Sequence, residues 1–357
     1  MNRQGPATAV TAPVSASASA APPARRRAAR LRILWLLLLV ALVLALVVLS
    51  LRLGSRDVSW SDVFAVLTGP PEGFDQASIA RRIPRTVLAL LAGAALAVSG
   101  AVMQGVTRNP LADPGILGVN MGASLAVVIG IAFFGLSTAD GYIWFALVGA
   151  SVVAVLVYSI GSLGRGGATP LKLALAGAAT AAALSSLVSA IVLPRANIAG
   201  GVQAWQLGGV GGGTYPNIRT VLPFLVVGFV ICLLTARGLN SLALGDELAA
   251  GLGERVAVTR AVAALGAVLL CAAVTAIAGP IGFVGLVVPH ACRLLTGVDH
   301  RWLLPFSALG GAALLTLADV VGRVVTPPAE IEVSIITALI GAPLFIAIVR
   351  RRKVTAL

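Results

Sequence analysis

Lysine, histidine and cysteine are scarce in this chain of 357 residues. The only lysines are Lys172 and Lys353, and neither follows a glycine. The sequence therefore lacks the GxxxxGK[ST] loop that holds the phosphates of ATP, so the chain has no such route to ATP hydrolysis. The two histidines and three cysteines form no CxxC or HExxH motif, and we expect no metal site and no cofactor in this chain. A GxSxG motif is missing as well, which argues against a membrane-embedded hydrolase.

Charged residues are also few, at 11% of the chain, whereas 58% of the residues are hydrophobic. The mean hydropathy of +0.99 is far above that of a soluble domain, and it indicates a polytopic, all-helical membrane protein. The formal net charge of +13 could suggest nucleic acid. The basic residues, however, cluster at the ends of apolar runs, which favours the lipid membrane and excludes nucleic acid as the partner.

The apolar runs predict ten transmembrane helices. They cover residues 33–51, 86–107, 113–140, 141–164, 172–195, 220–236, 261–277, 281–295, 302–323 and 333–349. Gly279 and Pro280 divide an uncharged run that is too long for one span. Glycine, alanine and serine in the second span suit close helix packing. Residues 196–218 are glycine-rich, and we interpret them as a non-spanning outer segment with a short helix at 202–207.

The basic residues also orient the chain. Ten spans place both termini on one side, and with the N-terminus inside, 18 of the 26 basic residues are cytoplasmic. This agrees with the positive-inside rule. We interpret residues 1–30 as a disordered basic cytoplasmic tail rather than a cleaved signal peptide, because no clear cleavage site follows the first span. Residues 31–353 form the transmembrane domain.

The cytoplasmic segment 240–256 is patterned. Leucines alternate there with Asp246, Glu247 and Glu254, which predicts two short amphipathic helices broken at Gly251 and Gly253. Such helices serve either as interfacial anchors or as docking surfaces. Three acids and a single arginine argue against an anchor, because anchors are usually basic on their polar face.

Four stretches resemble the FecCD family of permease subunits from ABC importers for iron–siderophores, haem and vitamin B12. They are residues 82–118 (RIPRTVLALLAGAALAVSGAVMQGVTRNPLADPGILG), the 240–256 segment, residues 278–305 (AGPIGFVGLVVPHACRLLTGVDHRWLLP) and residues 337–345 (TALIGAPLF). The resemblance covers nearly the whole chain after residue 50, and the first and third stretches are long and specific.

The resemblance implies a multi-pass protein of a bacterial cytoplasmic membrane with ten helices per subunit. The subunit would pair with a second copy of itself or with a paralogous permease, around a path on the two-fold axis. Two ATPase subunits, which bind ATP and magnesium, would lie on the cytoplasmic side, and a substrate-binding protein would dock outside. The expected cargo is a ferric siderophore, with haem or vitamin B12 as alternatives.

Three arginines match family positions that receive acidic side chains of the binding protein, namely Arg82, Arg85 and Arg323. Exposed arginines can form bidentate pairs with carboxylates and steer encounter. A plainer interpretation makes Arg82 and Arg85 headgroup anchors at the end of a span. Arg323 also has an internal candidate partner, Asp319, four residues earlier on the same helix.

The resemblance also assigns residues along the path from the ATPase to the outer mouth. The expected ATPase-coupling residues are Gly245, Asp246, Ala250, Leu252 and Gly253. The expected path or gate residues are Gln104, Asn109, Trp205 and Gly208, although packing hydrogen bonds and a plain loop are simpler roles for them. One departure is clear: family members usually carry proline and glycine where this chain has Glu332 and Ser334.

A secondary transporter driven by protons is a rival from a different class. Asp319 or His290 would then be the titrating group within the membrane. That hypothesis predicts uptake by the chain alone, collapsed by an uncoupler. The importer hypothesis instead predicts uptake only in the presence of an ATPase partner.

Overall fold

A computed structural model describes residues 23–54, 58–163 and 170–352, and this part of the chain is helical without any β-strand. Its helices are α1 (Pro23–Arg52), α2 (Trp60–Thr68), α3 (Gly73–Thr107), the 3-10 turn η1 (Pro114–Leu117), α4 (Val119–Phe134), α5 (Ala139–Ser162), α6 (Pro170–Val192), α7 (Ala196–Leu207), α8 (Tyr215–Leu242), α9 (Asp246–Gly251), α10 (Val256–Ala278), α11 (Val284–Thr296), α12 (His300–Val324) and α13 (Val333–Arg352).

Each of the ten apolar runs contains one helix. Seven helices among the described residues are long and apolar enough to cross a membrane: α1, α3, α5, α6, α8, α10 and α12. The apolar helices α4, α11 and α13 are shorter. The chain is therefore a multi-pass membrane protein. The predicted break at Gly279 and Pro280 is confirmed, because α10 ends at Ala278 and α11 begins at Val284.

Several helices extend beyond the predicted bounds. α3 begins at Gly73 and continues through Pro84, although the second span was expected from residue 86. The polar side chains in its first turns mark the end of the apolar layer, and they do not end the helix. α7 likewise spans Ala196–Leu207, and α1 begins at Pro23, inside the expected tail. The remainder of that expected tail, residues 1–22, lies outside the described residues.

The short helix α2 was not predicted. Its N-cap is Ser59, whose hydroxyl accepts a hydrogen bond from the backbone N–H of Asp62 at 3.2 Å. This is the usual way to satisfy a free N–H in the first turn of a helix. Val63 is buried on the inner side of α2, while Trp60 and Phe64 are exposed.

The core forms around α3. This helix packs against α8, α10, α11 and α12, and together with α10 it is the most buried of the long helices. Close approach depends on glycine: a Cβ on Gly93 would overlap the carbonyl of Gly311 on α12, and a Cβ on Gly100 would overlap the backbone of Gly285 on α11. The predicted small-residue face of the second span is therefore confirmed.

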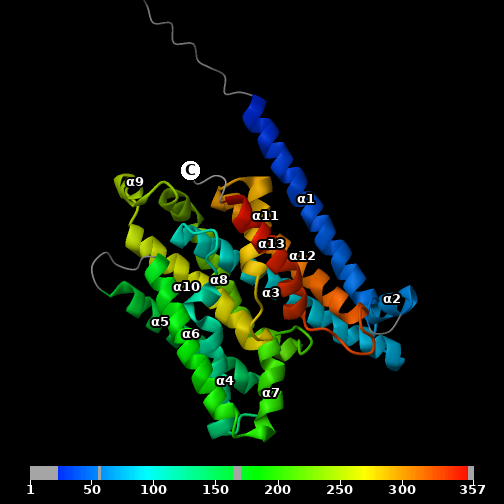
Figure 1. Cartoon of the computed structure of the whole chain (residues 1–357). Coiled ribbons are helices and arrows are strands. Elements are labelled where there is room, and N and C mark those ends of the chain that lie inside the picture. The colour runs from blue at the N-terminus through cyan, green and yellow to red at the C-terminus, as the bar shows by residue number, and fades with distance from the viewer. Residues whose placement is uncertain (1–22, 55–57, 164–169, 353–357) are drawn as a thin grey trace, which may run out of the picture.

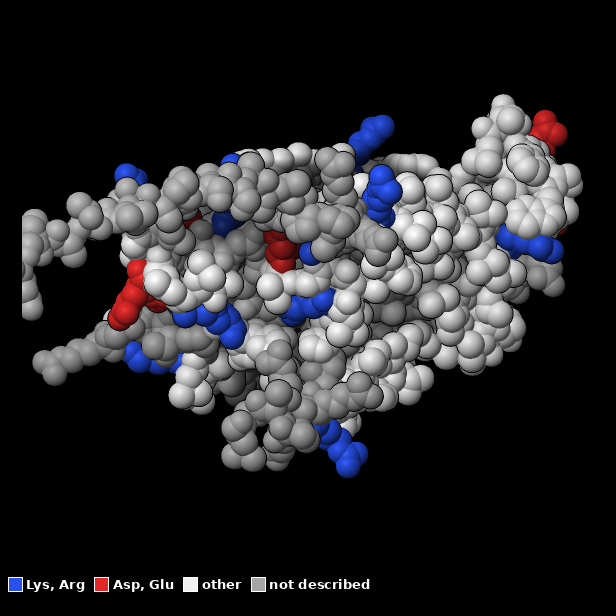
Figure 2. Space-filling view, turned by 90° about the horizontal axis from the view of Figure 1, so that it is seen from above, with Lys and Arg blue, Asp and Glu red and all other residues white. Residues whose placement is uncertain are grey.

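The two ends of the molecule differ. Figure 1 shows the first turns of α1, helix α9 and the end of α13 in the upper part, while α2 and α7 lie in the lower half. Figure 2 shows the molecule from above, with lysine and arginine at several places around the rim and acidic side chains at fewer. The 240–256 segment and the end of α13 therefore share an end that carries more basic than acidic side chains.

Candidate functional site

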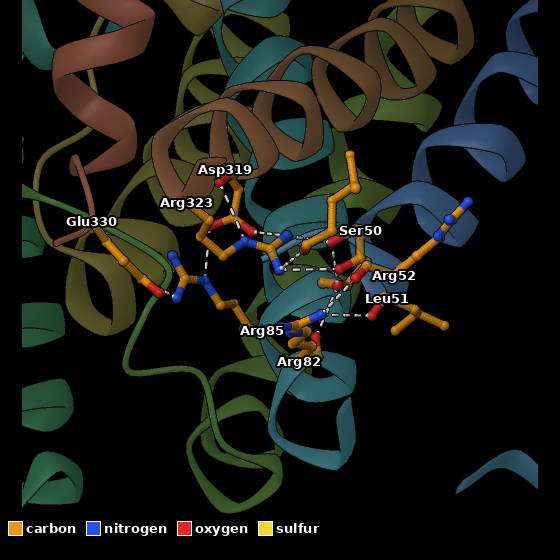
Figure 3. Close-up of polar contacts among 10 residues, drawn as sticks. Ser50, Leu51, Arg52, Arg82, Arg85, Asp319, Arg323 and Glu330 are labelled. Carbon is orange, nitrogen blue, oxygen red and sulfur yellow. Dashed lines mark hydrogen bonds and ion pairs between the residues drawn. The ribbon is translucent and has the colours of Figure 1, made fainter. Parts of the chain in front are cut away.

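Charged side chains gather where α3 and α12 meet the end of α1 (Figure 3). We call Arg82, Arg85, Asp319, Arg323 and Glu330 the arginine cluster. Asp319 is fully buried, and its carboxylate lies 2.8 Å from Nε of Arg85 and 2.9 Å from Nη2 of Arg323. Arg85 also contacts Glu330 through Nη1 at 2.6 Å. The expected pair of Asp319 with Arg323 is confirmed, and a second guanidinium group joins it.

The other donors of this cluster bind the C-terminal end of α1. Arg323 donates from Nη1 to the carbonyl oxygens of Ser50 and Leu53, both at 3.0 Å. Arg82 donates from Nη1 to the carbonyl oxygens of Leu51 (3.0 Å) and Arg52 (2.9 Å). The last carbonyls of a helix have no donor within the helix, and the cations also offset its negative end. Two arginines thus cap α1 from neighbouring helices.

This geometry bears on the expected outer docking surface, which stays a prediction. A docking arginine must present its guanidinium group to the partner, yet Arg82 and Arg323 are 6% and 2% exposed. Their donors point inward because the end of α1 and Asp319 need them. Arg85 is the third member, and its bond to the exposed Glu330 places it nearest to solvent. In this conformation, Arg85 is the one of the three arginines whose guanidinium group reaches toward solvent, and it does so only partly.

The positions that depart from the family pattern touch the predicted gate. Ser334 donates from Oγ to the carbonyl of Leu207, and its backbone N–H donates to the carbonyl of Gly208 at 3.4 Å. The Glu332 carboxylate lies against the Cα of Gly209. Burial raises the pKa of Glu332, although nearby Arg85 opposes this shift. Glu332 and Ser334 therefore attach the start of α13 to the end of α7.

The turn after α7 is held from a second side as well. The Gly209 N–H donates to the carbonyl of Ala278 at 2.8 Å, at the end of α10. Gly208 has φ +69°, and a Cβ there would overlap the carbonyl of Pro280. A side chain is therefore excluded at Gly208 by conformation and by space. Trp205 is half-buried beside this turn, so two predicted gate residues lie at the junction of α7, α10 and α13.

The other two predicted path residues make hydrogen bonds with backbone groups. Gln104 is buried, and its Nε2 donates to the carbonyl of Gly285 at 3.0 Å. Asn109 accepts from the N–H of Leu111 at 3.0 Å, which shapes the turn after α3. These contacts are the packing roles considered from the sequence. A role for either residue in the path remains a prediction.

The 240–256 segment contains one helix rather than the expected two. α9 ends at Gly251, and the chain turns through Leu252 and Gly253 directly into α10. Gly245 and Gly253 have φ +113° and +85°, which favours glycine at both positions. The glycines thus form the hinges of a single helix.

The apolar residues of this segment divide into two sets. Leu242 and Ala249 are fully buried and attach the segment to the core. Leu244, Leu248 and Leu252 are 58%, 62% and 69% exposed. Leu248 lies in α9, and Leu244 and Leu252 flank this helix. Exposed leucines between charged residues form a surface that another protein can cover. The docking role expected from the sequence would therefore rest on these three leucines.

Asp246 joins α9 to two neighbouring elements. Its carboxylate receives a bidentate pair of hydrogen bonds from Arg260 on α10, at 3.0 and 2.8 Å. It also forms an ion pair with Arg108, directly after α3. The sequence predicted Asp246 but missed both arginines, because their side chains meet it only in the folded chain. Displacing α9 would therefore act directly on α3 and α10.

The FecCD transport family matches residues 41–351. The chain belongs to this family. FecCD proteins are transport permease subunits, which agrees with the sequence prediction that this chain is not an enzyme. The family match extends from α1 into α13 and includes the arginine cluster and the 240–256 segment.

Curated relatives and a solved structure agree with this assignment. The chain is 45% identical to the ferric enterobactin transport system permease protein FepD of Escherichia coli (strain K12), over 85% of this chain and 91% of FepD. It is 42% identical to the iron(3+)-hydroxamate import system permease protein FhuB of Bacillus subtilis (strain 168), over 85% of this chain and 80% of FhuB. A solved metal-chelate type ABC transporter in an inward-facing conformation is similar with a TM-score of 0.77 and 32% identity, over 88% and 98% of the two chains.

Proposed function

We propose that this chain is the membrane-spanning permease subunit of an ATP-driven importer for a ferric siderophore in a bacterial cytoplasmic membrane. Membership of the FecCD transport family supports the importer. The relatives described above are named for ferric enterobactin and iron(3+)-hydroxamate, which favours a siderophore over haem or vitamin B12. ATP and magnesium would bind to the separate ATPase subunits.

The proposed subunit crosses the membrane ten times with both termini in the cytoplasm. The helix at each of the ten apolar runs and the excess of basic residues at the α9 end support this topology. The short helices α4, α11 and α13 would complete the count. Two such subunits, or one with a paralogous permease, would enclose the path, and recognition of the siderophore would lie largely in the binding protein outside.

The exposed leucines of the 240–256 segment are the observation that carries the proposal. A cleft of the ATPase would cover Leu244, Leu248 and Leu252, while Gly245, Ala250 and Gly253 allow the partner to approach closely. Closure of the ATPase pair on ATP would then displace α9. Asp246 would pass this displacement to Arg108 and Arg260, and so to α3 and α10.

On the outer side, we place the docking of the binding protein at Arg85 and the connection between α12 and α13. Arg85 bonds to an exposed carboxylate, Glu330, that an acidic side chain of a partner could replace. The shared Asp319 would keep Arg85 oriented during this exchange.

Reconstitution tests the proposed function. Proteoliposomes with this chain, its cognate ATPase and its binding protein should take up ferric siderophore only when ATP is supplied to the ATPase side. Vesicles without the ATPase should take up none. Uptake by the chain alone, collapsed by an uncoupler, would instead establish the proton-driven transporter and overturn the importer.

A further inference from the structure

A cavity of about 470 Å³ lies between α8 and α12, near the end of the molecule that carries α9. It is lined by Leu233, Leu234, Ala236, Arg237, His300 and Arg301. None of these residues belongs to the arginine cluster or to the 240–256 segment. The cavity therefore needs its own explanation.

The rim of the cavity is cationic. Arg237 and Arg301 are exposed, and neither makes an ion pair within 4.0 Å with a carboxylate of the described residues. Asp299 lies close by, but its Oδ1 already accepts hydrogen bonds from Nδ2 of Asn240 at 2.6 Å and from the N–H of Arg301 at 3.0 Å. The charge of Arg301 also acts on Asp299, but neither guanidinium group is held by a carboxylate at ion-pair distance in the described part of the chain, so both are available to an external anion.

The other side of the cavity is apolar. Leu233 and Leu234 are 51% and 76% exposed, and they lie about one helical turn before Arg237 on α8, further into the apolar span. Both leucines lie in the helix Tyr215–Leu242, which is long and apolar enough to cross the membrane. A ligand that fills this cavity meets cations at one end and hydrocarbon at the other.

The wall between these two regions is held rigidly. His300 is buried, its Nδ1 lies 2.9 Å from Oδ1 of Asn240, and its backbone N–H donates to the same oxygen at 2.8 Å. Asn240 is on α8 and His300 begins α12, so these bonds fix the two helices that carry the arginines. A preformed site loses less conformational entropy when it binds.

We propose that this cavity binds one anionic phospholipid, with its phosphate between Arg237 and Arg301 and its acyl chains along Leu233 and Leu234. Basic pockets between membrane helices suit anionic headgroups, and the adjoining exposed leucines favour a lipid over a soluble phosphate. With the orientation proposed above, the lipid belongs to the cytoplasmic leaflet. The proposal does not depend on which substrate the permease carries.

Native mass spectrometry of the delipidated full-length chain tests the site. We expect dioleoyl-phosphatidylglycerol to bind more tightly than dioleoyl-phosphatidylcholine, with an affinity that falls as salt rises. Arg237→Gln and Arg301→Gln should each weaken phosphatidylglycerol binding about fivefold, as for ~1 kcal/mol per basic residue near an anionic headgroup. Arg219→Gln is the matched control, because Arg219 is exposed at the opposite end of α8.

Four results would overturn the proposal. Equal affinity for the two lipids would remove the anionic preference, and an unchanged affinity in the double glutamine variant would place the lipid elsewhere. Displacement of the lipid by glycerol phosphate at equal concentration would identify a site for a soluble anion. If the double glutamine variant does not fold, Arg237→Lys with Arg301→Lys keeps the charge and must still prefer phosphatidylglycerol. Loss of that preference in a folded lysine variant with an unchanged melting temperature would also reject the site.

Discussion

Arg323 on α12 binds Ser50 on α1 through two atoms: Nη1 donates to the carbonyl oxygen at 3.0 Å and Nη2 donates to the hydroxyl at 2.7 Å. The same guanidinium group contacts Asp319, which is fully buried. One side chain therefore neutralises a buried acid and caps the end of a neighbouring helix. Such a group is costly to remove, because the carbonyl oxygens of Ser50 and Leu53 lose their donor and buried Asp319 loses one of its two ion pairs.

Arg323→Met should accordingly destabilise the chain. We expect a loss of about 3 kcal/mol, the lower part of the range for breaking a buried ion pair, because Arg85 still contacts Asp319. Thermal unfolding of the purified chain in detergent measures the loss as a lower melting temperature. The matched control is Arg81→Met, because Arg81 is exposed on α3. If both variants melt at the same temperature, Arg323 does not have this structural role.

Arg85→Gln should weaken the affinity for the binding protein, in addition to the stability that is lost with its ion pair to buried Asp319. Arg85 bonds to the exposed Glu330, whereas Arg82 is buried against the end of α1. We expect binding-protein affinity for the transporter to fall about tenfold in Arg85→Gln, with a weaker dependence on salt, as for the loss of an interface charge pair. Arg82→Gln should lower the melting temperature and leave the affinity for the binding protein unchanged. Binding measured by surface plasmon resonance at two salt concentrations distinguishes the two variants, and equal affinities would contradict docking at Arg85.

Ser334→Ala should loosen the turn after α7. The Ser334 hydroxyl donates to the carbonyl of Leu207, and a hydrogen bond of this kind contributes about 1 kcal/mol, or about a fivefold change in opening. Amide hydrogen exchange across residues 207–213 should therefore become about fivefold faster. Ser186→Ala is the control, because its hydroxyl donates within α6 to Ala182. Unchanged exchange in Ser334→Ala would show that the contact with Leu207 does not hold this turn.

The sequence predicted the positions of the helices well. It predicted less well which side of each helix packs against the rest of the protein. Apolar runs report membrane burial directly, so each of the ten contains a helix. The inward direction of Arg82 could not be deduced, because its acceptors, the carbonyls of Leu51 and Arg52, lie in another helix. In the sequence, a charged residue beside a span that faces solvent cannot be distinguished from one that faces the end of another helix.

The 240–256 segment shows a second limit. Its alternation of leucine and acid correctly predicted an amphipathic helix, but glycine was treated as a break at Gly251 when the helix includes that residue. Gly245 and Gly253 are the true turns, since both have positive φ. The pairing of Asp246 with Arg108 could not be predicted either, because the two residues lie far apart in the sequence and no motif links them.

Acid should weaken the start of α12. Burial alone would raise the pKa of Asp299, but hydrogen bonds from Asn240 and Arg301 hold that pKa below its usual value. A depressed carboxyl pKa stabilises the fold above the unfolded pKa of about 3.9, and this contribution is lost as the pH falls through the lower folded value. The melting temperature of Asp299→Asn should therefore depend less on pH than that of the wild type below about pH 5. Parallel curves for the two proteins would reject this assignment.

Leu252→Gln should uncouple the permease from its ATPase. Leu252 is 69% exposed beside α9, so its loss leaves the fold intact but removes apolar area from the proposed interface. Burying a leucine contributes about 1.5–3 kcal/mol, so affinity for the ATPase should fall by at least about tenfold. The control is Leu294→Gln, because Leu294 is 81% exposed on α11 and lies outside the segment. The affinity is measured by titrating the purified permease with ATPase, and ATP-dependent uptake is then measured in proteoliposomes. Affinity and uptake should fall together in Leu252→Gln and stay unchanged in Leu294→Gln, whereas an equal response in both variants would mean that α9 is not the docking helix.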